Sequence, residues 1–291
     1  MRRWLAAILF VGAIVAGTWL DARFEPPPRS GLVLSADLHV HPYPGDGALT
    51  VAQLRREAAR RGLDVIAITS HNHQFALRLP SLAALWPPRP SVESVMVLPG
   101  QEVTTPGFHL IAVGIDRVID WRLSVTEAVA EIHQQGGAAI AAHPIERSWR
   151  PLDGASLAAL DGAEVAHPIT AAAPSTRAVL ETFFARAAEA NPDLAPVGST
   201  DFHVTGPLGR CRTYLIVPER SPAGAIAALR RGTTVAGDHD GRLHGSAPDV
   251  ALVRRALASA GPVAGPSTAE KTAALTALFG LLLAILPLGS R

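Results

Sequence analysis

Short apolar segments of this chain repeatedly end in a histidine or a carboxylate. Each segment is rich in Val, Ile, Leu or Ala and is followed by a turn or helix signal, which is typical of parallel strands buried on both faces. Because the carboxyl ends of parallel strands meet at one edge of a sheet, we expect the side chains that follow them to lie close together. Nine potential metal ligands occupy such positions: His39, His41, Asp46, His71, Glu102, His109, His143, Asp201 and His203.

Two pairs of these ligands are separated by a single residue. His39 and His41 form one pair, and Asp201 and His203 form the other. Residues i and i+2 of a strand point to the same face, so each pair would present two ligands to one space. Imidazoles mixed with carboxylates suit Zn, Mn or Fe, whereas sites made only of oxygen suit Mg or Ca. At about four to six ligands per ion, the set predicts two or three divalent metal ions as cofactors.

Predicted strands and helices alternate through the middle of the chain. Thr50 and Gln53 have the spacing of a capping box, and Gly62 ends the helix that they begin. Ser221 and Pro222 open another helix, in which proline takes the first helical position. This alternation predicts an α/β fold with parallel strands, right-handed crossovers and a site at the strand carboxyl ends.

Eight of the nine ligands, all but His109, lie in motifs that resemble those of the PHP (polymerase and histidinol phosphatase) domain, in the family order. The motifs are residues 37–41 with Asp46 and Gly47, then 66–72, 100–103, 142–144 and 198–203, within roughly residues 33 to 240. The resemblance implies a distorted (βα)7 PHP-type barrel, a trinuclear metal site at the carboxyl ends of its strands, and usually phosphoester hydrolysis. Ser70 departs from the pattern, because many members carry Asp there; the rate or the metal preference can differ accordingly.

Clustered divalent ions lower the pKa of bound water, hold phosphoryl oxygens and neutralise charge on the leaving group. We therefore predict an enzyme that hydrolyses a phosphate ester with a metal-activated hydroxide, with Glu102, Asp201 and His203 as its catalytic residues. The expected grouping is His39, His41, Glu102 and Asp201 on one ion, Asp46, His71 and His203 on a second, and His109, His143 and Glu102 on a third.

Phosphoryl oxygens that touch no metal ion need another partner, and guanidinium groups bind them well. Arg147, Arg210 and Arg212 follow closely on motif residues, and His167 lies at another predicted strand end. We predict that these four residues bind substrate. The only cysteine, Cys211, lies in a strand-like stretch and is interpreted as a packing residue.

Amidohydrolases also begin with His-x-His on a strand, and they often bridge their metals with a carboxylated lysine. The only lysine here is Lys271, which lies beside the C-terminal apolar run, so Glu102 is the predicted bridging ligand. Two alternatives stay open: a metal-dependent hydrolase of a non-phosphate bond, amidohydrolase-like, and a non-catalytic metal-binding sensor tethered to a membrane.

Two apolar runs lie at the ends of the chain. Residues 4–20 and residues 272–288 each contain 17 residues without a charge, near the short limit for a membrane span. The sequence predicts an N-terminal transmembrane anchor or signal peptide over 1–24 and a C-terminal transmembrane helix over 271–289.

Between them we expect a metallohydrolase domain over 33–245 and a linker over 246–270 that can hold a short helix. Arg2, Arg3 and Arg291 place both termini in the cytoplasm. We therefore expect contact with a lipid bilayer through the terminal helices, membrane localisation, and a catalytic domain on the periplasmic side.

The net charge of the chain indicates which classes of partner it can bind. Twenty-six basic and 25 acidic residues give a net charge of +1, and no basic tail or patch is present in the sequence. We therefore expect no stable nucleic-acid partner. The expected substrate is a phosphorylated small molecule, a nucleotide or a short oligonucleotide.

Overall fold

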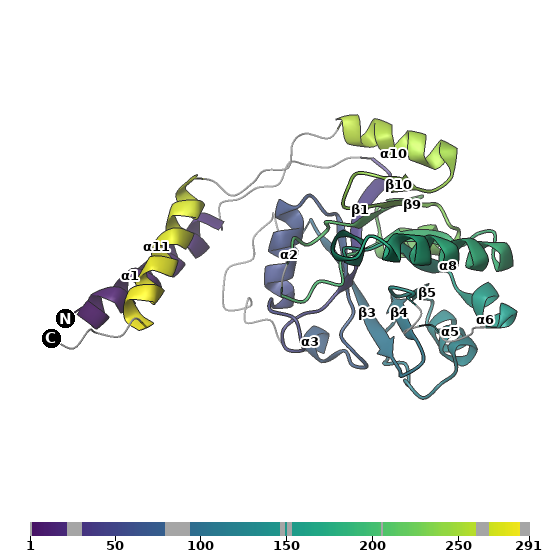
Figure 1. Ribbon diagram of the computed structural model, residues 1–291, viewed down its shortest axis with the longest axis horizontal. Helices are drawn as coiled ribbons and strands as arrows, with labels where there is room; N and C mark the ends of the chain where they lie inside the picture. The colour runs from purple at the N-terminus through teal and green to yellow at the C-terminus, as the bar shows by residue number, and fades with distance from the viewer. Residues whose placement is uncertain are drawn as a thin grey trace.

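The computed structural model describes residues 2–21, 31–78, 94–145, 149, 153–204, 206–259 and 268–285. Figure 1 shows a sheet surrounded by helices and, beside it, a pair of helices formed by the two ends of the chain. The strands are β1 (Val33–Val40), β2 (Val65–Ile68), β3 (Met96–Thr104), β4 (His109–Val113), β5 (Ala138–Ala141), β6 (Gly162–Ala166), β7 (Ala195–Gly198), β8 (Arg212–Ile216), β9 (Thr234–Gly237) and β10 (Leu243–His244).

These strands form one ten-stranded sheet in the order β10-β9-β8-β1-β2-β3-β4-β5-β6-β7. Neighbours β1, β2 and β3 are parallel, as are β5, β6 and β7. Strands β4, β8 and β10 run antiparallel to their neighbours, so the sheet is not a strict repeat of βα units. The predicted α/β barrel-like fold is confirmed.

The sheet curls until its last strand, β7, lies against β8 and β9, which makes a nearly closed barrel. The Thr213 hydroxyl in β8 donates to the Gly198 carbonyl at 2.8 Å, and the Thr234 hydroxyl in β9 donates to the Pro196 carbonyl at 2.8 Å. A Cβ on Gly198 would lie 2.6 Å from the Arg212 carbonyl oxygen, so this approach requires glycine.

Closure continues beyond β7, at the carboxyl end of β1. Val40 and Phe202 form a parallel bridge, in which the His41 N–H donates to the Phe202 carbonyl at 2.9 Å. The residues on either side of this bridge are the two predicted ligand pairs. The β1 strand is buried, and its alternation puts Asp37, His39 and His41 on one face.

Helices cover the outside of the barrel (Figure 1). They are α2 (Val51–Arg60), α3 (Phe75–Arg78), α5 (Val125–Gln134), α6 (Gly154–Ala159), α7 (Ile169–Ala172), α8 (Thr176–Ala190), α9 (Pro222–Arg230) and α10 (Ala247–Ser259). The predicted capping box at α2 is confirmed, because the Thr50 hydroxyl accepts from the Gln53 N–H and the Gln53 side chain accepts from the Thr50 N–H. Helix α10 lies within the predicted linker, and the domain boundaries remain predictions.

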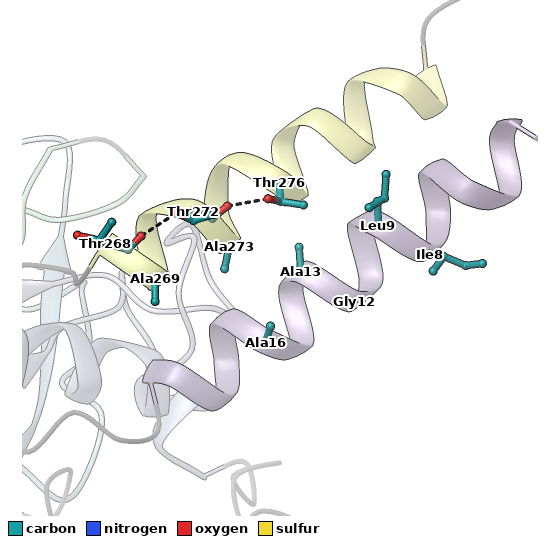
Figure 2. A pocket seen from close by; sticks show the side chains of 10 residues that line it. All are labelled: Ile8, Leu9, Gly12, Ala13, Ala16, Thr268, Ala269, Thr272, Ala273 and Thr276. Atoms are coloured by element: carbon teal, nitrogen blue, oxygen red, sulfur yellow. Dashed lines mark hydrogen bonds between the residues drawn. The ribbon is translucent and has the colours of Figure 1, made fainter.

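The helices at the two ends of the chain, α1 (Arg2–Asp21) and α11 (Thr268–Ile285), pack against each other (Figure 1). Small residues allow this close approach: a Cβ on Gly280 would lie 2.8 Å from the backbone nitrogen of Phe10. Figure 2 shows a groove between them that is lined largely by small side chains, including Gly12, Ala13 and Ala273.

Among the residues that the structure describes, no helix is both long enough and apolar enough to cross a bilayer. The predicted transmembrane helices and the predicted membrane localisation are therefore wrong. The physical reason lies in length and charge. A span needs about 20 apolar residues, whereas the uncharged run within α1 has 17, and α11 carries Lys271 in its first turn.

Candidate metal centre

All the predicted ligands lie at one edge of the barrel. His39, His71, His143 and Asp201 lie at or just beyond the carboxyl ends of parallel strands β1, β2, β5 and β7, and Glu102 lies near the carboxyl end of β3. His109 begins β4 instead. Because β4 is antiparallel to β3, its amino end lies at the same edge, and Thr104 pairs directly with His109.

The ligand atoms form three groups of mutually close donors, each within 4.8 Å. The groups are His41, Asp46, His71 and His203; His39, His41, Glu102 and Asp201; and Glu102, His109 and His143. They contain all nine predicted ligands. The grouping differs from the predicted one only because His41 joins two groups through its two ring nitrogens.

Glu102 lies at the middle of the centre and is completely buried. Its Oε2 is 2.8 Å from His71 Nδ1, and its Oε1 is 2.7 Å from His109 Nδ1. Three further imidazole nitrogens lie at 3.3 to 3.4 Å, those of His39, His41 and His143. Burial alone would raise the pKa of Glu102, but His39 and the hydrogen bonds from His109 and His143 hold it well below its usual range.

Several buried atoms of the centre have no hydrogen-bond partner among the described residues. They are His39 Nε2, both ring nitrogens of His41, Glu102 Oε2 and Asp201 Oδ1. Buried polar atoms without partners are costly and therefore uncommon. These atoms nevertheless face one another: Asp201 Oδ1 is 3.2 Å from His39 Nε2 and 3.1 Å from His41 Nε2. Divalent cations fit this donor set, since each would supply the partner that the atoms lack.

The centre opens on the side of Asp46, whose side chain is 46% exposed. Its Oδ2 lies 3.1 Å from both His71 Nε2 and His203 Nε2, and its Oδ1 lies 3.3 Å from His41 Nδ1. His41 and His203 also stack, with ring centroids 3.9 Å apart. The side chains of Asp46, His71 and His203 are therefore exposed to solvent in part on this side.

Two ligands have left-handed backbone conformations that non-glycine residues rarely adopt. The φ angle is 28° at His143 and 50° at Asp201. Such conformations cost about 1–3 kcal/mol each and persist only where the surroundings hold them. The strain indicates that these two backbone conformations are held in place because they direct the side chains of His143 and Asp201 into the centre.

Of the predicted substrate-binding residues that the structure describes, only His167 lies at the centre. His167 Nε2 lies 3.9 Å from Asp201 Oδ2 and has no hydrogen-bond partner in the described part of the chain. The Arg212 guanidinium instead donates to the Gly209 carbonyl at 2.7 Å and to the Ser35 hydroxyl at 3.3 Å, towards the amino end of β1. Arg210 is exposed, and Arg147 lies outside the described residues.

Two buried carboxylates beneath the centre are absent from the predicted set. Asp37 accepts hydrogen bonds from the backbone N–H groups of Thr200 and Gly209 at 3.1 and 2.9 Å. Glu164 accepts from His39 Nδ1 at 3.0 Å. The available sequence signal is a charged residue inside an apolar strand, and at Glu164 it is reinforced by His167 shortly after it.

Cys211 is completely buried, in agreement with its interpretation as a packing residue. Burial and the nearby Asp238 raise the pKa of its thiol. Asp238 itself is 2.5 Å from Arg177 Nη1, so a positive charge already neutralises it.

We expect no reaction of the Cys211 thiol in the folded chain with a thiol reagent at pH 8 and one reactive thiol per chain after denaturation, measured by absorbance. Rapid labelling of the folded chain would contradict this placement.

No protein-family model matches the chain. The uncharacterized protein MJ1587 of Methanocaldococcus jannaschii is 32% identical over 145 residues, which cover 45% of this chain and 81% of that protein. A two-domain protein of Bacteroides vulgatus that contains a predicted PHP-like metal-dependent phosphoesterase aligns with a TM-score of 0.60 and 22% identity, over 81% of this chain and 73% of that chain. PsfC of Pseudomonas syringae aligns with a TM-score of 0.48 and 17% identity, over 78% of this chain and 98% of that chain.

The likeness to the Bacteroides vulgatus protein shows a shared fold, which agrees with the PHP-type barrel that the motifs imply. The likeness to the Methanocaldococcus jannaschii protein extends to sequence and covers most of that relative. The chain therefore belongs to the same family as MJ1587.

Proposed function

We propose that this chain is a metal-dependent hydrolase of phosphate esters. The observation that carries the proposal is the joining of three ligand groups through Glu102 and His41, with buried donor atoms that lack partners in the described chain. The protein of the same fold that contains a predicted PHP-like metal-dependent phosphoesterase supports this chemistry. The proposed substrate is a small phosphorylated molecule, a nucleotide or a short oligonucleotide.

The three ligand groups would hold two or three divalent ions, and their mixed imidazole and carboxylate donors suit Mn, Zn or Fe. Bound together, such ions supply water of lowered pKa and positive charge opposite the phosphoryl oxygens. The chain's own residues fix the donors: Glu102 and Asp201 each face more than one imidazole, and His203 faces the open side with Asp46.

His167 supplies a hydrogen-bond donor beside the centre. Its Nδ1 accepts from the Ile169 N–H at 3.2 Å, so the neutral ring carries its proton on Nε2. That nitrogen is buried, unpartnered among the described residues and directed towards Asp201. We propose that it donates to an oxygen of the bound phosphoryl group, a role that the distant Arg212 guanidinium does not fill.

Two substitutions at His167 separate its two ring nitrogens. His167→Asn keeps an acceptor for the Ile169 N–H but removes the Nε2 donor, whereas His167→Gln keeps a donor near Nε2. We expect His167→Asn to lower kcat roughly 10²-fold and to leave metal content unchanged, while His167→Gln retains more activity. Steady-state kinetics with metal analysis checks this, and equal loss in both variants would contradict the donor role.

Phosphate release from a panel of monoesters, diesters and nucleotides tests the proposed function. The full chain is stripped of metal and reloaded with Mn, and His143→Ala serves as the inactive comparison because it removes one ligand. We expect metal-dependent turnover that the variant lacks. Bound metal without turnover on any phosphoester would favour hydrolysis of another bond or a sensor role, and would overturn the proposal.

A further inference from the structure

Glu164 is a buried carboxylate that contacts the metal centre from beneath. It lies in the middle of β6, is 0% exposed, and belongs to none of the three ligand groups of the centre. A charge buried to this extent is retained only where strong partners compensate it. The identity of its partners therefore indicates what it does.

The first partner is the His39 ring. Glu164 Oε1 lies 3.0 Å from His39 Nδ1, while the opposite nitrogen, Nε2, faces Asp201 Oδ1 at 3.2 Å. A hydrogen bond from Nδ1–H fixes the tautomer and leaves the lone pair of Nε2 directed at the centre. Carboxylates bonded to the far nitrogen of a metal-binding histidine orient the ring and increase its basicity.

The other two partners reach the ends of two further strands. The His143 backbone N–H donates to Glu164 Oε2, at the residue whose φ of 28° is strained. The Ser199 hydroxyl donates to Glu164 Oε1, two residues before Asp201, which is strained in the same way. One carboxylate thus contacts the ligand-bearing ends of β1, β5 and β7.

We propose that Glu164 is a positioning residue that fixes three metal ligands of different strands, His39, His143 and Asp201, in one arrangement. The proposal rests on the metal centre of the proposed function. It explains why this position needs a carboxylate: Glu164 accepts from three donors through both oxygens. A glutamine has one acceptor oxygen, and its amide nitrogen would face an N–H or a hydroxyl donor.

Asp161, which immediately precedes the amino end of the same strand, provides a matched control. It is also largely buried, and its Oδ2 lies 2.7 Å from His133 Nε2 and 2.7 Å from the Ala139 backbone nitrogen. It therefore makes the same two kinds of contact as Glu164, to an imidazole and to a backbone N–H, but it precedes β6 and touches no ligand of the centre.

The test compares the unaltered full chain, Glu164→Gln and Asp161→Asn by Co²⁺ binding. Affinity is measured by competition with a chelator, the ligand field by the visible spectrum of the bound Co²⁺, and folding by circular dichroism. We expect Glu164→Gln to bind Co²⁺ roughly 10- to 100-fold more weakly, with an altered visible spectrum. Asp161→Asn should lower thermal stability and leave affinity and spectrum unchanged.

The outcomes are distinguishable from those for the proposed function, because none of these readings uses turnover. If Glu164→Gln binds Co²⁺ within twofold of the unaltered chain and with the same spectrum, the positioning role is overturned while the metal centre stands. If the unaltered chain binds no Co²⁺, both are overturned. A folded Glu164→Asp variant that recovers affinity relative to Glu164→Gln supports the need for a carboxylate.

Discussion

Glu102→Gln is expected to abolish turnover and to release most of the bound metal. Glu102 belongs to two of the three ligand groups, and its two oxygens face the imidazoles of five histidines. The amide keeps the volume but removes the negative charge that both groups share, and it replaces the oxygen donor of one group with an NH2. We expect kcat to fall by roughly 10³-fold or more, the upper range for a single electrostatic contact, and metal content to fall in parallel by elemental analysis.

Glu181→Gln is the matched comparison for this variant. The same chemical change is then made on an exposed face of α8, away from the ligand groups. We expect its activity, metal content and stability to equal those of the unaltered chain. A Glu102→Gln protein that keeps its full metal content and more than a tenth of the turnover would show that Glu102 does not join the groups.

Removal of metal is expected to lower the thermal stability of the chain by a large margin. Without ions, buried atoms of His39, His41, Glu102 and Asp201 lack partners, whereas ions that bind only the folded state stabilise it by mass action. One site at a hundredfold excess over Kd contributes about 2.7 kcal/mol. For a chain of 291 residues that corresponds to a rise in Tm of roughly 4–5 °C, with more from further sites.

Scanning calorimetry on chelator-treated protein, with and without added Mn or Zn, measures this effect. The gain in Tm should shrink in Glu102→Gln, because that variant lacks the negative charge that two groups share, and persist in Glu181→Gln. A Tm that responds to neither metal nor chelator would contradict a metal centre in the folded chain.

The gathering of the nine candidate ligands could be predicted from the sequence because two physical regularities act together. The two-residue period of a strand places His39 with His41, and parallel strands place their carboxyl ends at one edge. His109 lies at the same edge although it begins its strand, because β4 is antiparallel to β3 and its amino end lies beside the carboxyl end of β3. The sequence shows that it starts a strand, and only the pairing of β4 with β3 shows why it faces Glu102.

Other features depend on tertiary contacts that local patterns do not contain. Glu164 is a charged residue in a short strand, and its role becomes visible only when His39, His143 and Ser199 are seen around it. Arg212 follows a motif closely in sequence, yet its side chain is directed away from the ligand groups and donates to the Gly209 carbonyl and the Ser35 hydroxyl. The prediction that Arg212 binds substrate relied on its closeness to the motif in sequence, and this does not bring its guanidinium to the ligand groups.

The parallel bridge between Val40 and Phe202 completes the ring of the barrel at the same level as the ligands. One ligand pair flanks Val40 and the other flanks Phe202, so the bridge and the metal centre share the same two short backbone segments, 39–41 and 201–203. Cations bound between the two pairs would hold the two backbone segments together. If the bridge opened, His39 and His41 would separate from Asp201 and His203. Removal of metal would therefore weaken the join between the end of β1 and the segment that follows β7.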